Sequence, residues 1–324
     1  MRCKPLRRGA KVEIIMIKVM NNGGIALHTH LNQISKGDLK HQMRHPAETF
    51  DLKINRLLSA LKDLDQKVQT SVEKNVSFDN DESMAKALFT YVQAVDELYD
   101  ASFLIMKSLN NTITSENKDA IKWCQSNCKQ PYSEFKGAVD KYHELIRTIS
   151  NKVKHDSLMV DFVSLVTNRN VKISGFYFSN VIGDNNLNGA DVDIHQEYNG
   201  SSTAFSYNFF ISYTLGFTFY IIDKLNGVLF KGKKLKNDEY IGWPAGIGLL
   251  DVFQKYSKYF FPDEYKQYCM NLNKNKNSMD VTFPYKANPI IGYRIDRVQP
   301  SFRICQPDRE FMNKFPYHTL MWPQ

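Results

Sequence analysis

Three polar side chains on one stretch have the types and spacing to act on a phosphodiester. Arg147, Asn151 and His155 follow one another at four-residue steps in KYHELIRTISNKVKHDS, residues 141–157. On a helix, 100° per residue places them within about 80° of each other. Arginine neutralises a phosphate, asparagine holds it by hydrogen bonds, and histidine transfers a proton near neutral pH. This set suits RNA cleavage without a metal, because the 2′-hydroxyl supplies the nucleophile and cations stabilise the pentacovalent phosphate.

Two lysines flank the same face, which also has a plainer interpretation. Lys152 and Lys154 lie beside the three polar residues and could steer a polyanion toward them. However, any amphipathic helix has a polar face opposite its apolar one, and basic residues in a last turn suit the helix dipole. The face is therefore either an RNA-directed catalytic site or a solvated or partner-binding surface.

Four histidines near the N-terminus have spacings that metal ligands use. His28 and His30 are two residues apart, and His41 and His45 are four apart. No carboxylate or cysteine completes the set at a recognisable spacing, so a solvated basic segment is the more ordinary interpretation.

A second group of this kind lies near the middle of the chain. Asp191, Asp193 and His195 alternate along a predicted strand, so they would share one face and could bind a divalent cation. A solvent-facing hairpin edge is again the more ordinary interpretation. The turn GDNNLNGAD, residues 183–191, has part of a calcium-loop pattern but lacks its bidentate Glu. We expect no metal and no cofactor.

Composition and missing motifs exclude several classes of protein. The sequence has no P-loop, no dinucleotide-binding glycine pattern, no nucleophile elbow and no HExxH, which argues against NTP hydrolysis, Rossmann chemistry and zinc proteolysis. The net charge of +8 over 324 residues permits a polyanionic partner. Five cysteines are too few for a disulfide scaffold. With no recognisable export signal, we expect reduced thiols in the cytoplasm.

Two segments need comparison with membrane-directed sequences. The first 20 residues begin like a signal peptide, but Glu13 and Lys18 interrupt the apolar run and no cleavage site follows. Residues 198–222 carry no charge and are long enough to span a bilayer. Many asparagine, serine and threonine residues dilute this second stretch, so a buried core element is expected and no membrane span.

The helix that would position the polar residues belongs to a helical region, residues 46–169. Apolar residues recur there at three- and four-residue steps, and long helices with short connections indicate an antiparallel bundle. Residues 1–45 hold most of the excess positive charge and are expected to form a basic N-terminal arm. Residues 170–324 are expected to be an α+β region, in which 171–182 form a strand and 205–230 a buried helix.

The run Asn151-Lys152-Val153-Lys154-His155 at the end of a long helix resembles the HEPN superfamily. In particular, it is similar to uncharacterised bacterial HEPN-like proteins with an Asn-Lys-x-Lys-His signature. The later segments ISGFYF, DIHQEY and TAFSYN resemble the β-containing extension of such proteins. Ribonucleases of this superfamily use an arginine, a polar residue and a histidine, the last two of which match Asn151 and His155. Ser150 occupies the arginine position, and Arg147 is the nearest arginine.

The resemblance implies a mainly α fold, an HEPN-like antiparallel helical bundle followed by an α+β extension. It implies an RNA-directed protein, a metal-independent endoribonuclease of a toxin–antitoxin or phage-defence system. The expected catalytic residues are Arg147, Asn151 and His155, with Lys152 and Lys154 binding RNA. It also implies a homodimer with the motif at its interface, and an antitoxin or defence partner. The alternative is a non-catalytic dimeric interaction or sensor protein that uses the same face.

Overall fold

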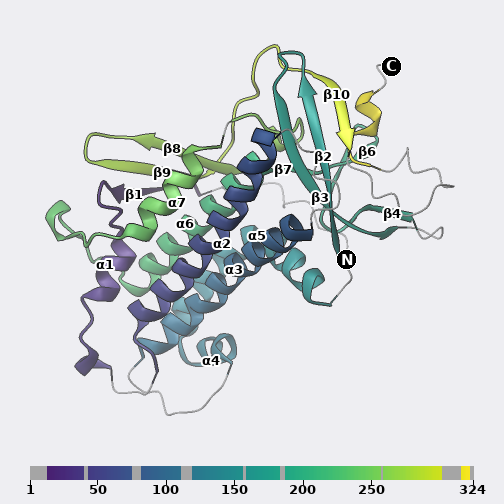
Figure 1. The fold of residues 1–324 in the computed structure, drawn as a ribbon. Coiled ribbons are helices and arrows are strands. Elements are labelled where there is room, and N and C mark those ends of the chain that lie inside the picture. The colour runs from purple at the N-terminus through teal and green to yellow at the C-terminus, as the bar shows by residue number, and fades with distance from the viewer. Residues whose placement is uncertain are drawn as a thin grey trace.

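Long amphipathic helices lie side by side through the centre of the molecule (Figure 1). The structure is a computed structural model that describes residues 13–39, 43–74, 82–110, 119–155, 158–182, 187–256, 258–300 and 315–321. The apolar repeats predicted these helices, and the prediction is confirmed. They are α2 (Pro46–Lys74), α3 (Glu82–Ser108), the short α4 (Ala120–Asn127) and α5 (Lys129–His155).

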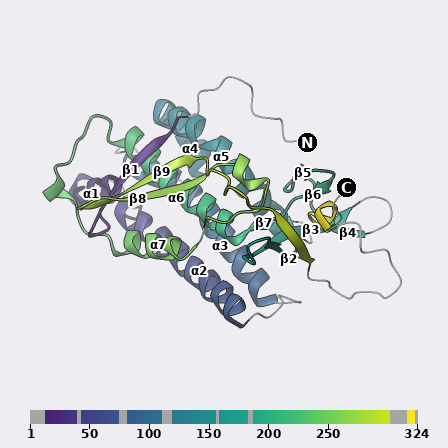
Figure 2. The same cartoon turned by 90° about the horizontal axis from the view of Figure 1, so that it is seen from above.

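Helix α6 (Tyr207–Leu229) is the central element of the fold (Figure 2). It packs against α3 and α5 on one side and against strands β8 (Cys269–Lys274) and β9 (Ser278–Tyr285) on the other. Its residues are buried almost without interruption, as predicted for the charge-free stretch. Gly216 is required for this packing, because a Cβ atom there would lie 2.3 Å from the Phe283 ring. The smaller helices α1 (Ala26–Asn32) and α7 (Pro244–Gln254) also contact α6.

A curled five-stranded antiparallel sheet lies at one end of the helices (Figure 1). The strand order is β10-β2-β3-β4, and β7 pairs with β3. The strands are β2 (Met159–Thr167), β3 (Lys172–Ile182), β4 (Leu187–Ala190), β7 (Phe205–Ser206) and β10 (Ile295–Pro300). Strand β3 confirms the prediction for residues 171–182. Strand β2 lies inside the region expected to be helical, so the boundary at residue 169 falls within the β2–β3 turn.

A second sheet joins segments that are far apart in the sequence. Strand β1 (Ile15–Met20) pairs antiparallel with β9 (Ser278–Tyr285), which also pairs with β8 (Cys269–Lys274). The expectation of a solvated basic arm is therefore wrong for residues 15–32, where β1 and α1 are largely buried. Residues 1–12 lie outside the described part of the chain. The remaining short elements are β5 (Glu197–Tyr198), β6 (Ser201–Ser202), η1 (Lys36–Asp38), η2 (Asn237–Glu239), η3 (Glu264–Lys266) and η5 (His318–Met321).

The fold class predicted from the sequence is wrong. The described residues are 54% helical and 20% strand with several sheets, which makes the structure an α+β fold rather than a mainly α bundle with an extension. The error arose because β2 is buried on both faces, and such a strand shows no alternation that separates it from a helix.

One hydrophobic core runs through the helices and both sheets. It includes side chains from Ile15 at one end of the chain to Phe283 near the other, so the predicted regions share a single core. A smaller cluster, which includes Leu165, Phe261 and Tyr317, fills the curled sheet. Within the described residues, no helix has the length and apolar character needed to cross a membrane.

Candidate functional site on helix α5

The polar residues of α5 form a row at four-residue spacing that begins one step before the predicted trio. His143, Arg147, Asn151 and His155 make up this row, which we call the α5 polar row. Each four-residue step advances 400°, so successive members turn by about 40° around the helix. The side chain of His143 is 5% exposed and that of Arg147 33%, whereas Asn151 and His155 are exposed. The row therefore starts against α3 and ends in solvent.

Arg147 faces α3 rather than solvent. Its Nη2 donates to Oδ1 of Asp100 at 2.7 Å, and its Nε lies 3.3 Å from Oδ1 of Asp96. The guanidinium also lies over the ring of Tyr99, 5.7 Å from its centroid. Because two carboxylates of the same chain hold it, Arg147 joins α5 to α3. The structure does not bring it to the exposed end of the row with Asn151 and His155.

Asp96 is the centre of a buried polar cluster beneath the row. It is 1% exposed and receives hydrogen bonds from Nε2 of His143 and from Oγ of Ser150, each at 2.9 Å. The ammonium of Lys154 lies 3.6 Å from its Oδ2. Burial alone would raise the pKa of Asp96, but the His143 hydrogen bond, the Arg147 charge and the Ser150 hydrogen bond together lower it. Asp96 is therefore a stable anion that orients His143.

The predicted RNA-binding residue Lys152 holds a carboxylate pair instead of facing solvent. Its Nζ lies 2.9 Å from Asp191 Oδ2 and 3.0 Å from Asp193 Oδ2. The lysine lies where a divalent cation would have bridged these carboxylates. His195 does not join them, because its Nε2 accepts a hydrogen bond from the backbone N–H of Phe178 at 2.9 Å. Burial lowers the pKa of His195 to about 3, so it is neutral and structural.

The N-terminal histidines are also dispersed. His28 lies 3.6 Å from Asp51, His30 hydrogen bonds with Asn226 at 2.9 Å, and His45 contacts the carbonyl oxygen of Ile34 at 3.1 Å. His41 lies outside the described residues. Across the described part of the chain, no group of three or more His, Cys, Asp or Glu side chains has a geometry suited to a metal.

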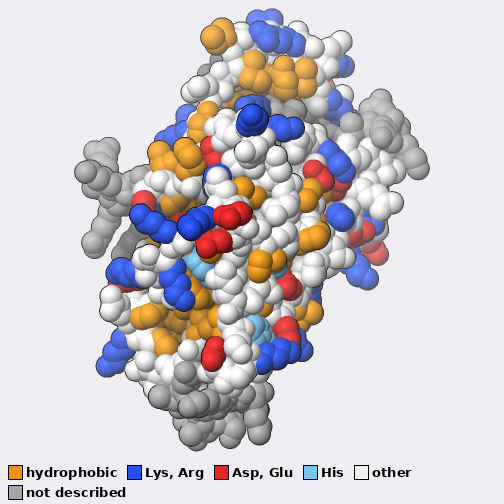
Figure 3. Space-filling view, turned by 90° about the vertical axis from the view of Figure 1, so that its left-hand side faces the viewer, with side chains coloured by type: hydrophobic (Ala, Val, Ile, Leu, Met, Phe, Trp, Pro, Cys, Tyr) orange, Lys and Arg blue, Asp and Glu red, His pale blue; other side chains and the backbone are white. Residues whose placement is uncertain are grey.

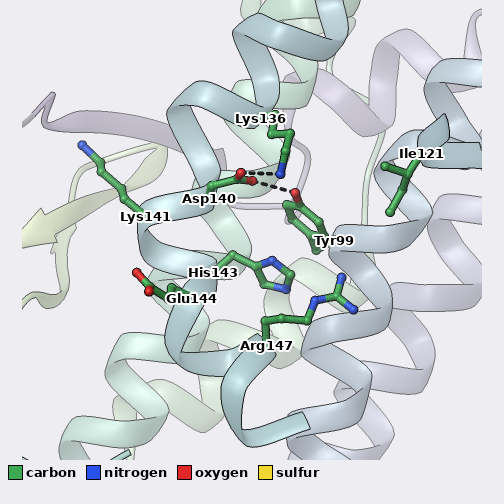
Figure 4. Close-up of a pocket in the computed structure, with 8 residues that line it drawn as sticks. All are labelled: Tyr99, Ile121, Lys136, Asp140, Lys141, His143, Glu144 and Arg147. Carbon is green, nitrogen blue, oxygen red and sulfur yellow. Dashed lines mark hydrogen bonds and ion pairs between the residues drawn. The ribbon is translucent and has the colours of Figure 1, made fainter. Parts of the chain in front are cut away.

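A pocket of about 430 Å³ opens beside the buried end of the row (Figure 4). Tyr99 of α3 forms its inner wall, and Ile121 of α4 stands opposite α5. The ring of His143 stacks on Tyr99 with a centroid separation of 3.7 Å, and the Tyr99 hydroxyl donates to Asp140 at 2.7 Å. The pocket is lined by Tyr99, Ile121, Lys136, Asp140, Lys141, His143, Glu144 and Arg147.

Charge on the surface is mixed rather than of one sign. Figure 3 shows one face of the molecule, on which basic and acidic side chains are interspersed with hydrophobic patches. Sequence reasoning expected the polyanion-steering lysines to be free, but Lys152 and Lys154 are both drawn toward acids of this chain. Any nucleic acid bound here would therefore meet a local site rather than a broad basic surface.

Sequence reasoning found the exposed end of the α5 polar row and missed its buried end. His143 precedes Arg147 by the same four-residue step that led to the trio, so that spacing was a signal for it. Asp96 carried no such signal, because its place under α5 depends on how α3 packs against that helix.

No protein-family model, curated protein or solved structure showed a significant match to this chain.

Proposed function

We propose that the chain is a divergent HEPN-like, RNA-directed protein that acts on a phosphodiester without a metal. The observation that supports this proposal best is the pair of exposed side chains, Asn151 and His155, one turn apart at the end of α5. An amide and an imidazole at this spacing can contact one phosphate and transfer a proton next to it. The ion pairs of Arg147 exclude it from this pair, and we assign it the role of positioning α5 on α3.

The proposed reaction is transesterification within RNA. His155 takes the proton of a 2′-hydroxyl, and that oxygen attacks the adjacent phosphorus while Asn151 donates a hydrogen bond to a phosphoryl oxygen. The bond from phosphorus to the 5′ oxygen breaks, and that oxygen receives a proton from an imidazolium. The products are a 2′,3′-cyclic phosphate and a 5′-hydroxyl.

A second copy of the chain would complete such a site. One exposed imidazole can accept the first proton, and in a symmetric homodimer the partner subunit's His155 can donate the second. The setting that we propose, by the same resemblance, is a cytoplasmic toxin–antitoxin or phage-defence system in which an antitoxin or defence partner controls the protein.

A second candidate function is a non-catalytic dimeric interaction or sensor protein that uses the same face. The ion pairs favour this candidate, because Arg147, Lys152 and Lys154 are all drawn toward carboxylates of their own chain. On this account Asn151 and His155 contact a partner protein rather than a phosphate.

Incubation of the purified protein with total RNA in EDTA distinguishes the two candidates. The first predicts products with 2′,3′-cyclic phosphate ends, and His155→Ala should slow their formation by about 10²-fold or more. Gln66→Ala, at an exposed position on α2, is the control and should cleave like the wild type. Equal urea unfolding curves would show that both variants are folded. If the wild type binds and cleaves no RNA while His155→Ala weakens self-association, the second candidate replaces the first.

A further inference from the structure

The pocket at the buried end of the α5 polar row is separate from its exposed end. His143 and His155 are twelve residues apart, which places them about 18 Å apart along the helix axis. In Figure 4, Lys136, Asp140, His143 and Arg147 point toward Tyr99 and Ile121, whereas Lys141 and Glu144 leave α5 on the other side. The groups that face the pocket interior therefore come from one side of α5.

These groups have hydrogen-bonding capacity that the described part of their own chain does not use. Nε2 of His143 is bound to Asp96, and Nε and Nη2 of Arg147 face Asp96 and Asp100. Among the residues that the structure describes, no contact engages Nδ1 of His143 or Nη1 of Arg147. The ammonium of Lys136 carries three N–H groups and pairs with the single carboxylate of Asp140.

The unused hydrogen-bonding groups are mainly donors, which indicates a ligand rich in hydrogen-bond acceptors. Each oxygen of Asp140 already accepts a hydrogen bond, one from Tyr99 and one from Lys136. Arg147 and Lys136 can both donate to an oxyanion, and Nδ1 of His143 accepts from a protonated phosphate or donates to it when itself protonated. A phosphate group satisfies all three side chains, because it presents several oxygens around one centre.

The other residues that line the pocket can contact the part of such a ligand that lies beyond its phosphate. Asp140 retains lone pairs for a ligand hydroxyl, and Ile121 offers an apolar contact across the pocket. The ring of Tyr99 has His143 stacked on it and Arg147 above it, so we do not assign it to stacking with a base. The volume of about 430 Å³ is in the range of small-molecule sites and exceeds what an inorganic anion needs.

We propose that this pocket binds a small phosphate monoester with a hydroxyl-bearing body, such as a nucleoside monophosphate or a sugar phosphate. Arg147, Lys136 and His143 hold the phosphate, and Asp140 receives a hydroxyl of the ligand. The buried carboxylate of Asp96 keeps His143 in place from behind. This site is independent of the proposed reaction at His155, and its test uses no RNA.

Calorimetric titration and histidine NMR of the full chain test the pocket with four probes: adenosine monophosphate, ribose 5-phosphate, inorganic phosphate and adenosine. The first two should bind more tightly than inorganic phosphate, and adenosine should bind at least about tenfold more weakly than its monophosphate. The ring signals of His143 should shift on binding, while those of His30, which is buried on α1 and contacts Asn226 of α6, should not.

Matched lysine variants make the test specific to the pocket. Lys136→Gln should weaken binding of adenosine monophosphate by about tenfold, because one charge-assisted contact is lost. Lys62→Gln, at an exposed position on α2, should bind like the wild type. Absence of binding by every phosphate probe at about 10 mM would overturn the proposal, as would equal binding of adenosine and its monophosphate. If inorganic phosphate binds as tightly as both esters, the proposal that the pocket recognises a hydroxyl-bearing body is wrong.

Discussion

At the scale of single residues, Asp96 decides what the α5 polar row can do. It is buried and accepts hydrogen bonds from His143 and Ser150 while facing two cations, Arg147 and Lys154. A buried carboxylate is tolerated only when such partners replace the water it has lost. The same partners explain why Arg147 is not available to a ligand at the exposed end of the row, whereas the side chain of Lys154 remains 44% exposed.

Asp96→Asn should destabilise the protein by about 3 kcal/mol, because it leaves buried cationic and polar groups without their anion. Urea unfolding at neutral pH measures the loss. Asp63→Asn is the control: Asp63 forms an exposed pair with Lys67 on α2, and its loss should cost less than about 0.5 kcal/mol. A loss below about 1 kcal/mol for Asp96→Asn would show that the cluster adds little stability.

The lowered pKa of Asp96 also determines how the stability of the fold changes with pH. The folded chain holds the Asp96 proton more weakly than the unfolded chain, so this contribution to stability is fully present above the ordinary aspartate pKa of about 3.9. It is lost as the pH falls through the lower folded value. Unfolding free energies measured from pH 6 downward should fall less steeply for Asp96→Asn than for the wild type. Parallel curves would contradict this.

At the scale of elements, the start of α6 is held by one serine and one buried glutamate. Oγ of Ser206 accepts from the N–H of Phe209 at 3.1 Å and donates to Glu264 at 2.6 Å. Glu264 also accepts from the backbone N–H groups of Ser206 and Phe261. Because α6 is packed by both sheets and by α3 and α5, its first turn fixes the elements that carry the site.

Ser206→Ala should cost about 2 kcal/mol, because it removes a helix cap and leaves the buried carboxyl group of Glu264 short of a donor. Ser35→Ala is a matched control, since Ser35 caps the short and exposed η1. Its loss should lower the free energy of unfolding by only about a few tenths of a kcal/mol. Chemical unfolding followed by circular dichroism gives both values, and equal losses for the two serines would contradict the role of Ser206.

The helices and the curled sheet differ in how far the sequence could predict them. Helices α2 and α5 have buried and exposed faces at the helical period, and the apolar residues of the more deeply buried α3 recur at the same spacing, so the positions of all three follow from the residues. Strand β2 is buried along nearly its whole length, which removes the period-two pattern. The exposed pair Asn151 and His155 was predictable for the same reason as α5 itself. The engagement of Arg147 by Asp96 and Asp100 depends on helix packing, which local sequence does not encode.

At the scale of the whole molecule, the chain folds around one core that its first strand completes. Strand β1 pairs with β9 across more than 250 residues of sequence, which no local pattern could predict. Val19 of β1 is fully buried, while Met16 on the same strand is 68% exposed. We therefore expect the described N-terminal segment to be part of the cooperative fold.

Val19→Ala should lower the unfolding free energy by about 2 kcal/mol, through lost burial and the cavity that remains. Met16→Ala on the exposed side of β1 should change it by less than about 0.5 kcal/mol. A single transition, seen alike by circular dichroism and fluorescence, is expected in both variants because the sheets and helices share one core. Separate transitions would show that the first strand folds apart from the rest.

The most direct measurement of the central proposal is an NMR titration of the protein with a short single-stranded RNA that carries 2′-O-methyl groups and so cannot be cleaved. If the end of α5 contacts phosphodiesters, the signals of Asn151 and His155 should shift together and saturate. The signals of Asn55, which is exposed on α2, should stay in place. A saturating RNA concentration that leaves Asn151 and His155 unmoved, or that shifts only residues elsewhere, would contradict the proposal.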